Sequence, residues 1–475
     1  MELIYLEKWV LKRIEAEAKK DAALRDFLGD KHGELSRVML ERFQIYKLRQ
    51  ILDYVYERSP FYRKLFTDNQ ILPSEIRSLT DLSKIPFTEP KDIIADPYRF
   101  LCVSIGQISR IFTLKSSGTT GDAKRVFFTQ KDLHHIVNLL AAHTKTVSGN
   151  RKNVIQILLP GTRPFGQADL LAKGVEKAGA IPVITGVTSD PIKQIEAIDK
   201  NRSTILVGYP FYIYRVTQET KQKYSLKDLG IKAVVTTGEH IPLSVRNTIK
   251  QLWKADLFSH YGLVEMGLSV GIECEIHKGY HIDEADFIVE IVDPCTGRVL
   301  EEGEEGELVI TTLSREGMPL IRYRTRDLSR IIEGRCECGS ILKKIDMISK
   351  RIGTTINIGE IELYPSTFDE SLFSIPEIID YQVDVKREAE RVKLIFNVEA
   401  AESEITRSMI EKIVSEHPLI QNAVSKGKIE FEIRFLSKRR INSVLPYKRS
   451  AFPLVPPFRQ GTSHEMIKKD YEIDL

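Results

Sequence analysis

The sequence predicts an α/β protein. A large N-terminal domain of helix-covered, mainly parallel sheets plus a β-unit is expected to precede a small, mobile α+β C-terminal domain. Three observations predict this class: strand-like and helix-like segments alternate between about residues 150 and 285, paired strand-like runs follow, and helix and hairpin patterns are mixed after about residue 354. A length of 475 residues also indicates two or three domains.

The first 70 residues have few helix breakers and predict helices. The alternating region then combines apolar runs, typical of buried strands, with amphipathic stretches that carry helix-start signals. The predicted strands are 153–159, 204–209 and 231–239, and the predicted helices are 168–179, 190–200 and 242–253. Strands joined in this way form a mainly parallel sheet, so ligands are expected at the loops that leave their carboxyl ends.

Smaller β-structures are predicted further along the chain. Residues 286–313 contain two strand runs joined by turn-rich sequence, which predicts an antiparallel hairpin. After residue 354 the pattern predicts a helix, a hairpin over 380–400, another helix and a strand over 428–436. The proline-rich segment 446–460 is expected to be extended.

The composition is that of a soluble globular protein, with 42% hydrophobic and 28% charged residues. A net charge of +3, from 69 basic and 66 acidic residues, gives no electrostatic reason to expect nucleic acid or an anionic membrane as partner. No apolar run reaches the ~20 residues of a membrane helix, and the N-terminus lacks the features of a signal peptide. Five cysteines, an odd number in a long chain, argue against a disulfide framework. We therefore expect a cytoplasmic protein.

One short stretch, "SSGTTGDAK" at 116–124, consists mainly of residues with small or hydroxyl-bearing side chains and ends in a lysine. Glycine and hydroxyl residues let backbone N–H groups converge on phosphate oxygens, and Lys124 adds a movable positive charge. A flexible surface loop is the alternative for such a stretch taken alone. It is not the P-loop of nucleotide triphosphatases, because the Gly-Lys-Ser/Thr ending is missing.

Three further motifs follow in order: "TTGEHIP" (236–242), "SHYGLVEMG" (259–267) and "LIRYRTRDLSRI" (320–331). Together with the first stretch they resemble the ordered motifs of the adenylate-forming superfamily. "YERSPFYRKLF", "DLSKIPFTEPKDI", "MPLIRYRTRDLSRI" and "CECG" are similar to the phenylacetate–CoA ligase branch, and the resemblance runs from about residue 50 to 365. It implies that a carboxylate attacks the α-phosphorus of ATP, giving an acyl-adenylate and pyrophosphate. A thiol, usually coenzyme A, then displaces AMP.

The resemblance also implies roles for single residues. The β- and γ-phosphates would be cradled by Ser116, Ser117, Gly118, Thr119, Thr120 and Gly121. Lys124 would lie near the same phosphates as a catalytic cation. Because two anions must meet in the first step, charge neutralisation and in-line positioning carry most of the catalysis.

The next two motifs supply the adenine and metal contacts by the same resemblance. Gly238, Glu239 and His240 would line the adenine, although in isolation an ordinary strand-to-helix turn is the preferred explanation for them. Tyr261 would present an aromatic face to the base, and Glu265 would bind Mg²⁺, which favours hard carboxylate oxygens. A core aromatic and a solvated loop charge are the plainer alternatives for these two.

In the last motif Asp327 would bind the ribose hydroxyls, and Arg351 would lie near ribose and phosphate. Most of the superfamily has glycine before that aspartate, whereas Arg326 is typical of the phenylacetate branch. Arg330 either faces the phosphates or decorates a strand.

Cys274, His281, Cys336 and Cys338 form a second constellation. Three thiolates and one imidazole would complete a closed, tetrahedral, structural zinc site, and some relatives in the resembled branch carry cysteine and histidine at these places. His277 is the rival to His281 as the nitrogen ligand. Free buried cysteines and a surface turn are the alternative explanation.

The resemblance implies a domain boundary, with 1–350 as the adenylate-forming domain, 351–353 as a hinge and 354–475 as the small domain. Gly353 stands where the family has an acidic hinge residue, and glycine permits a large change in φ and ψ. Glu360 falls where a glycine commonly lets the pantetheine arm of coenzyme A pass.

The family also brings a lysine from the small domain to the reacting anhydride. Lys468 and Lys469 are the candidates, with Lys468 preferred, and a solvated charged tail is the alternative.

The expected function is therefore ATP- and Mg²⁺-dependent ligation of an aromatic or hydrophobic carboxylic acid to coenzyme A. Residues 208–216 either line an aromatic acid pocket or form a helix buried by its aromatics. One alternative keeps adenylation with another acceptor, namely a carrier-protein thiol, an amine or a cofactor hydroxyl. Another is a nucleotide-binding protein without turnover. Relatives suggest a homodimer.

Overall fold

The computed structural model describes residues 4–29, 35–115, 123–150, 152–387, 391–400 and 403–436. The predicted phosphate loop, Ser116 to Gly121, and the candidate lysines Lys468 and Lys469 lie outside the described residues. No helix within those ranges has the length and apolar character needed to cross a membrane.

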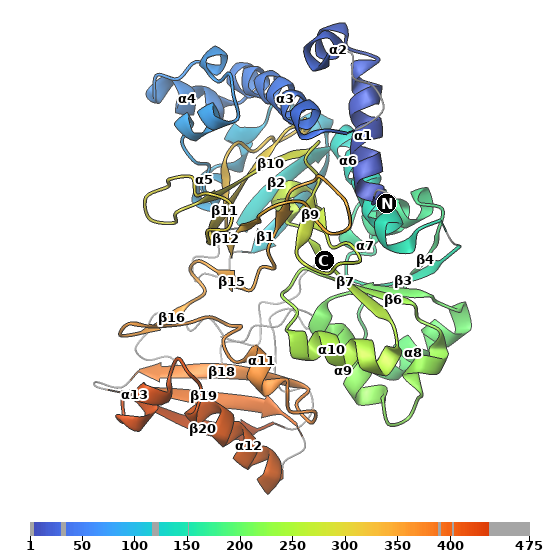
Figure 1. Ribbon diagram of the computed structural model, residues 1–475, viewed down its shortest axis with the longest axis vertical. Coiled ribbons are helices and arrows are strands. Elements are labelled where there is room, and N and C mark those ends of the chain that lie inside the picture. The colour runs from blue at the N-terminus through green and yellow to red at the C-terminus, as the bar shows by residue number, and fades with distance from the viewer. Residues whose placement is uncertain are drawn as a thin grey trace.

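The N-terminal region is helical, as predicted. Its helices are α1 (Tyr5–Ala18), α2 (Ala22–Leu28), α3 (Arg37–Arg58) and α4 (Pro60–Asp68). Ser59 separates the last two: its side chain accepts a hydrogen bond from the backbone of Tyr62, and Pro60 then occupies the first position of α4, where its missing N–H costs nothing. Figure 1 shows these helices (blue) at the top of the molecule.

A nine-stranded sheet forms the centre of the large domain (Figure 1). Its order from edge to edge is β13 (Ile331–Ile332), β14 (Lys344–Ile345), β9 (Tyr280–Ile282), β8 (Gly271–Ile272), β7 (Asp256–Tyr261), β6 (Ala233–Thr237), β5 (Ile205–Gly208), β3 (Val154–Leu158) and β4 (Ile181–Ile184). The strands from β7 to β4 are parallel. Their helices are α6 (Gln130–Ser148), α7 (Gln167–Lys177), α8 (Pro191–Asn201), α9 (Pro210–Thr220) and α10 (Leu243–Trp253).

The β-unit is an antiparallel sheet in the order β10 (Phe287–Val292), β11 (Gly306–Thr312), β12 (Tyr323–Ser329) and β15 (Lys350–Arg351). The pairing of β10 with β11 confirms the hairpin predicted over 286–313. A separate two-stranded sheet joins β1 (Ile108–Lys115) to β2 (Ala123–Thr129), so Lys124 stands at the start of a strand.

The C-terminal domain is α+β, as predicted. A small hairpin of β16 (Ile356–Ile358) and β17 (Ile361–Leu363) precedes a sheet of β18 (Asp380–Arg387), β19 (Val392–Glu399) and β20 (Ile429–Phe435). Its helices are α11 (Asp369–Leu372), α12 (Glu404–Ser415) and α13 (Gln421–Ser425). The hairpin β18–β19 is antiparallel and β20 adds in parallel.

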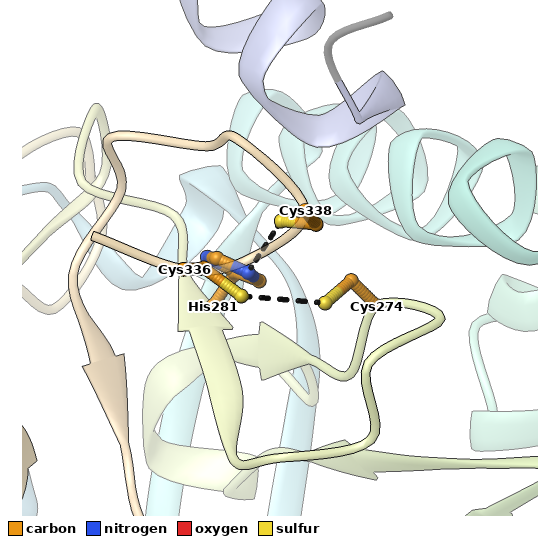
Figure 2. Close-up of side chains that lie close together, drawn as sticks. All are labelled: Cys274, His281, Cys336 and Cys338. Carbon is orange, nitrogen blue, oxygen red and sulfur yellow. Dashed lines mark hydrogen bonds between the residues drawn. The ribbon is translucent and has the colours of Figure 1, made fainter. Parts of the chain in front are cut away.

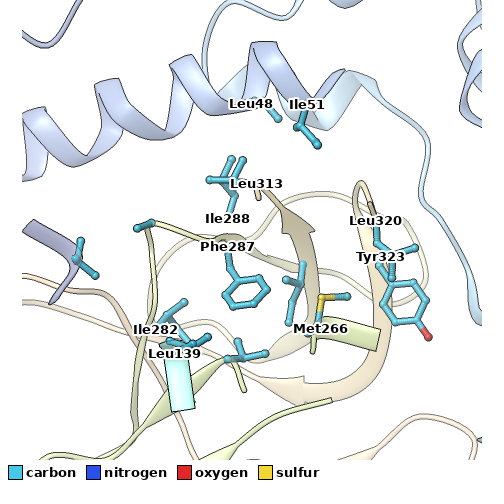
Figure 3. Close-up of a cluster of buried hydrophobic side chains, with 14 of the residues drawn as sticks. Leu48, Ile51, Leu139, Met266, Ile282, Phe287, Ile288, Leu313, Leu320 and Tyr323 are labelled. Atoms are coloured by element: carbon cyan, nitrogen blue, oxygen red, sulfur yellow. The ribbon is translucent and has the colours of Figure 1, made fainter. Parts of the chain in front are cut away.

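Two hydrophobic cores hold these layers together. Leu48 and Ile51 of α3 pack with Phe287 and Ile288 of β10 in the first core (Figure 3). The second core spans both domains, because Phe373 of the C-terminal domain lies 5.5 Å from the ring of Tyr214 on α9. Burial of such aromatic surface makes this contact a substantial part of the domain interface.

The structure decides between the two interpretations of residues 208–216. This segment begins α9, and the aromatics Tyr212 and Tyr214 are buried in the second core. The hydroxyl of Tyr214 donates to the backbone oxygen of Ile378, 3.0 Å away in the C-terminal domain. These aromatic side chains therefore pack the core, and the interpretation that they line a pocket for an aromatic acid is wrong.

Candidate active site

Two loops leave the same edge of the large sheet. Thr237 at the end of β6 pairs with His260 of β7, so Gly238, just after β6, and Tyr261, the last residue of β7, share the carboxyl edge. Gly238 has φ of +81°, a conformation that glycine adopts without strain, and it turns the chain toward α10. Glu239 and His240 are half-buried in this turn. Parallel sheets bind ligands at this kind of edge.

Tyr261 of the nine-stranded sheet and Asp327 of the four-stranded sheet meet between these two sheets. The Tyr261 hydroxyl donates a 2.7 Å hydrogen bond to Oδ2 of Asp327 on β12. Strand alternation along β12 buries Tyr323, Thr325 and Asp327 on one face. Burial raises the pKa of Asp327, against the opposing effects of a nearby arginine and of the Tyr261 hydrogen bond.

That arginine is Arg351. In the pairing of β12 with β15, Asp327 stands opposite Arg351, and their side chains approach to 3.2 Å. The carboxylate of Asp327 raises the pKa of the guanidinium, which also donates to the backbone oxygen of Thr325. Gly353 follows two residues later with φ of +84°, and apart from Gly353 and its two neighbours in the chain, no atom of the described residues lies within 4 Å of the position that a Cβ would take there. The aspartate is therefore linked directly to the segment that enters the C-terminal domain.

Lys124, Glu265 and Tyr323 form a second buried cluster beside it. The Lys124 ammonium and the Glu265 carboxylate are ion-paired, and both contact the hydroxyl of Tyr323 at 3.1 and 2.9 Å. Glu265 lies on the short helix η6 (Val264–Met266) and is 4% exposed. Burial alone would raise the pKa of Glu265, but the charge of Lys124 and its hydrogen bond lower it below the ordinary value.

The four predicted metal ligands also come together (Figure 2). Their ligand atoms are buried and all lie within 4.8 Å of one another. The Sγ atoms of Cys274 and Cys336 are 3.8 Å apart, and Sγ of Cys338 lies 3.4 Å from Nε2 of His281. Zinc–ligand bonds of 2.0–2.3 Å in a tetrahedron place the ligand atoms about 3.5–3.8 Å apart, so this geometry fits.

The structure selects His281 over His277 for this cluster. Nδ1 of His281 lies 3.3 Å from the backbone oxygen of Leu342, an arrangement that leaves Nε2 for a metal. His277 instead pairs with Asp256 at 3.0 Å and packs its ring against Phe258. The ligand atoms that gather here include those of His281 but not those of His277, whose Nε2 is paired with Asp256, so His281 is the nitrogen ligand that the geometry favours.

Comparison with known proteins decides the family. A model of the AMP-binding enzyme family matches residues 111–314. Phenylacetate-coenzyme A ligase of Thermus thermophilus is 32% identical over 375 residues, which cover 78% of this chain and 83% of that protein. The chain belongs to the phenylacetate–coenzyme A ligase family. The corresponding ligase of Escherichia coli is also 32% identical, over 77% of this chain and 84% of its own.

Solved structures agree on the fold. A 2-hydroxyisobutyryl-CoA ligase in the postadenylation state has a TM-score of 0.75 at 20% identity, covering 88% of this chain and 89% of its own. The same ligase in the thioesterification state has a TM-score of 0.64. Family membership makes the chain an ATP-dependent, AMP-forming acid–thiol ligase and confirms the resemblance drawn from the motifs.

Arg326 occupies an unusual backbone conformation. Its φ is +69°, in the left-handed region that favours glycine. Its backbone N–H donates to Glu307 and its carbonyl accepts from Ile352, while the guanidinium reaches Glu89 at 2.8 Å. A glycine, which the resemblance implies for most of the superfamily at this position, would suit this backbone, whereas the arginine here forms an ion pair with Glu89.

Two buried residues of the cluster had no role in the sequence analysis. Tyr323 joins Lys124 to Glu265, and Arg315 donates to the backbone oxygen of Glu265 at 2.9 Å. The alternation of side chains along "YRTRD" places Tyr323 on the same face of β12 as Asp327. The sequence pattern therefore could have predicted that Tyr323 faces the site. Arg330 binds Glu305 and Asp346 on the surface, which favours its interpretation as a strand decoration.

Proposed function

We propose that the chain activates a hydrophobic carboxylic acid with ATP at the site between strand β12 and the carboxyl edge of β6 and β7, and transfers the acyl group to coenzyme A. The observation that carries this proposal is an apolar cavity directly below that edge. Thr237 and His260 line the cavity, and the residues that follow them are Gly238 and Tyr261. An acid side chain in the cavity would thus leave its carboxylate at the nucleotide.

The walls of the cavity suit an apolar side chain. It measures about 60 Å³ and lies between α6 and the sheet, with Leu140, Ile155, Ile205 and Val235 among its lining residues. Apolar walls with few polar groups are the usual form of a small-molecule site. Four family relatives carry the name phenylacetate-coenzyme A ligase, which supports a hydrophobic acid as substrate.

The charged clusters support the nucleotide roles predicted from the motifs. Asp327 offers a buried carboxylate for the ribose hydroxyls, with Arg351 beside it, and Tyr261 offers a ring for the adenine. Gly238, Glu239 and His240 occupy the loop next to that ring. Ser116 to Gly121 would take the phosphates.

Lys124 and Glu265 neutralise each other in the structure, and we propose that they separate when ATP binds. Glu265 would then hold Mg²⁺, which neutralises phosphate charge when bound. Lys124 would turn to a phosphate oxygen. Tyr323 orients both groups through its hydroxyl.

Transfer to coenzyme A is proposed to follow rotation of the small domain. We propose the boundaries 1–350, 351–353 and 354–475, supported by the open surroundings and positive φ of Gly353. Before this rotation, in the first step, the small domain would present a lysine of the last segment, Lys468 in our proposal. Glu360 is exposed in the turn between β16 and β17, where Gly359 has φ of +61°.

The cysteine–histidine cluster is proposed to hold a structural Zn²⁺. Four protein ligands close the coordination shell and leave no position for a substrate, so the ion would stabilise the fold. Cys274 precedes β9 and the other two cysteines precede β14. A metal there would fasten the antiparallel end of the nine-stranded sheet.

Exchange of labelled pyrophosphate into ATP tests the first half-reaction across a panel of hydrophobic acids. We expect acid-dependent exchange, followed by thioester formation when coenzyme A is added. Absence of exchange with every acid would contradict adenylation. Exchange without thioester would exclude coenzyme A and select another acceptor.

A further inference from the structure

The acid cavity contains a polar group that its apolar walls do not explain. His143 of α6 lines the cavity and is 3% exposed. Its Nδ1 lies 2.9 Å from Oγ of Ser269, whereas its Nε2 has no hydrogen-bond partner among the described residues. Buried polar atoms nearly always have a partner, so the nitrogen is a candidate contact for a ligand.

His143 is the end of a chain of hydrogen bonds. Oγ of Ser269 also lies 2.8 Å from Nε2 of His260, and Nδ1 of His260 lies 2.8 Å from Oγ1 of Thr237. Burial lowers the pKa of His260 to about 4 and that of His143 well below its ordinary value, so both rings are neutral at pH 7.

Neutral imidazoles allow two orientations of this chain. If Ser269 donates to His143, Nε2 of His143 carries the proton and is available as a donor to a ligand. If Ser269 donates to His260, Nδ1 of His143 donates to Ser269 and Nε2 becomes an acceptor. The chain therefore lets His143 bind either an oxygen acceptor or a hydroxyl donor.

We propose that the substrate acid carries a hydroxyl or carbonyl group on its hydrophobic side chain, and that His143 selects the acid by binding this oxygen. The inference rests on the proposed function, because it assigns the cavity to the acid. A site built to hydrogen-bond a substrate group rejects the analogue without it, because the buried protein group is then left unpaired. His143 is thus a specificity-determining residue.

The test compares kcat/KM for matched acids, such as butyrate with β-hydroxybutyrate and β-oxobutyrate, and phenylacetate with para-hydroxyphenylacetate. For at least one pair we expect wild-type enzyme to prefer the oxygenated acid by about tenfold or more. His143→Leu should reduce that ratio to within about twofold of one, and His143→Gln should retain most of it.

His134→Leu, at an exposed position of the same helix, is the matched control and should keep the wild-type ratio. Ser269→Ala leaves His143 in place but breaks the chain of hydrogen bonds. It should therefore lower the ratio of kcat/KM for the oxygenated acid to that for its analogue. This variant replaces His143→Leu if the latter does not fold. No preference in any pair, or a preference that survives His143→Leu or Ser269→Ala, would overturn the proposal. Failure of all acids to promote exchange would instead overturn the proposed function.

Discussion

The ammonium of Lys124 and the carboxylate of Glu265 form a buried ion pair, with side chains 13% and 6% exposed. Removal of one partner from such a pair leaves an uncompensated charge in a region of low polarity. Substitution of Lys124 or Glu265 is therefore expected to affect both the activity and the stability of the protein.

Lys124→Met should abolish most pyrophosphate exchange and should lower the free energy of unfolding by about 3–5 kcal/mol. Urea unfolding at pH 7 measures the loss, and Lys124→Met/Glu265→Gln should recover most of it while exchange stays low. The loss of stability is expected because Glu265 is buried and would be left without its cation. Equal stability of Lys124→Met and wild type would show that the pair is hydrated in solution.

The same pair predicts an acid-dependent stability. In the folded protein the pKa of Glu265 lies below its ordinary value. The ionised carboxylate therefore contributes to the free energy of unfolding at a pH above the pKa that Glu265 has in the unfolded chain. This contribution is lost as the pH falls through the pKa of Glu265 in the folded protein. In Lys124→Met, burial dominates and raises that pKa, which reverses the sign. The stability difference between the two proteins should therefore shrink as pH falls from 7 to 4, and a constant difference would argue against it.

Arg326→Gly and Arg326→Ala separate backbone strain from the ion pair with Glu89. Both variants lose the pair, but only alanine keeps a Cβ at φ of +69°. We expect the glycine variant to be more stable than the alanine variant by about 1 kcal/mol in urea unfolding. Equal free energies of unfolding for the two variants would mean that the backbone at residue 326 relaxes from its positive φ when the arginine is replaced.

Zinc analysis of the purified protein should find about one equivalent. Cys336→Ser should reduce the metal content and lower the melting temperature, since binding energy at a structural site contributes to folding. Cys295→Ser is the control, because this cysteine is exposed and lies outside the cluster. Less than about half an equivalent in wild-type protein would count against a structural ion.

Asp327→Asn should raise KM for ATP more than it lowers kcat, if its carboxylate holds the ribose in both ground and transition states. Tyr261→Phe removes only the 2.7 Å hydrogen bond to that carboxylate and provides the milder comparison. A fall in kcat at unchanged KM would reassign Asp327 to the chemical step.

Local patterns predicted much of this architecture. Buried apolar runs defined β3, β5 and β6, and ordered motifs located Tyr261, Glu265 and Asp327. β4 was not predicted, because its two ends are exposed and a proline interrupts the apolar run. It is an edge strand, where proline is tolerated.

Contacts between distant segments were beyond prediction from one sequence. Tyr323 meets Lys124 only because β12 and β2 converge, and His143 reaches Ser269 only because α6 packs over the sheet. Periodicity gives the buried face of each element but not which faces meet. The zinc ligands were the exception, since their residue types alone restrict the chemistry.

The second core makes the coupling between domains sensitive to temperature. Rotation of the C-terminal domain away from α9 would part the ring of Phe373 from those of Phe211 and Tyr214 and expose them to water. Hydration of apolar surface increases heat capacity. If this movement limits turnover, the activation enthalpy itself changes with temperature, and an Eyring plot of the overall rate bends instead of following a line.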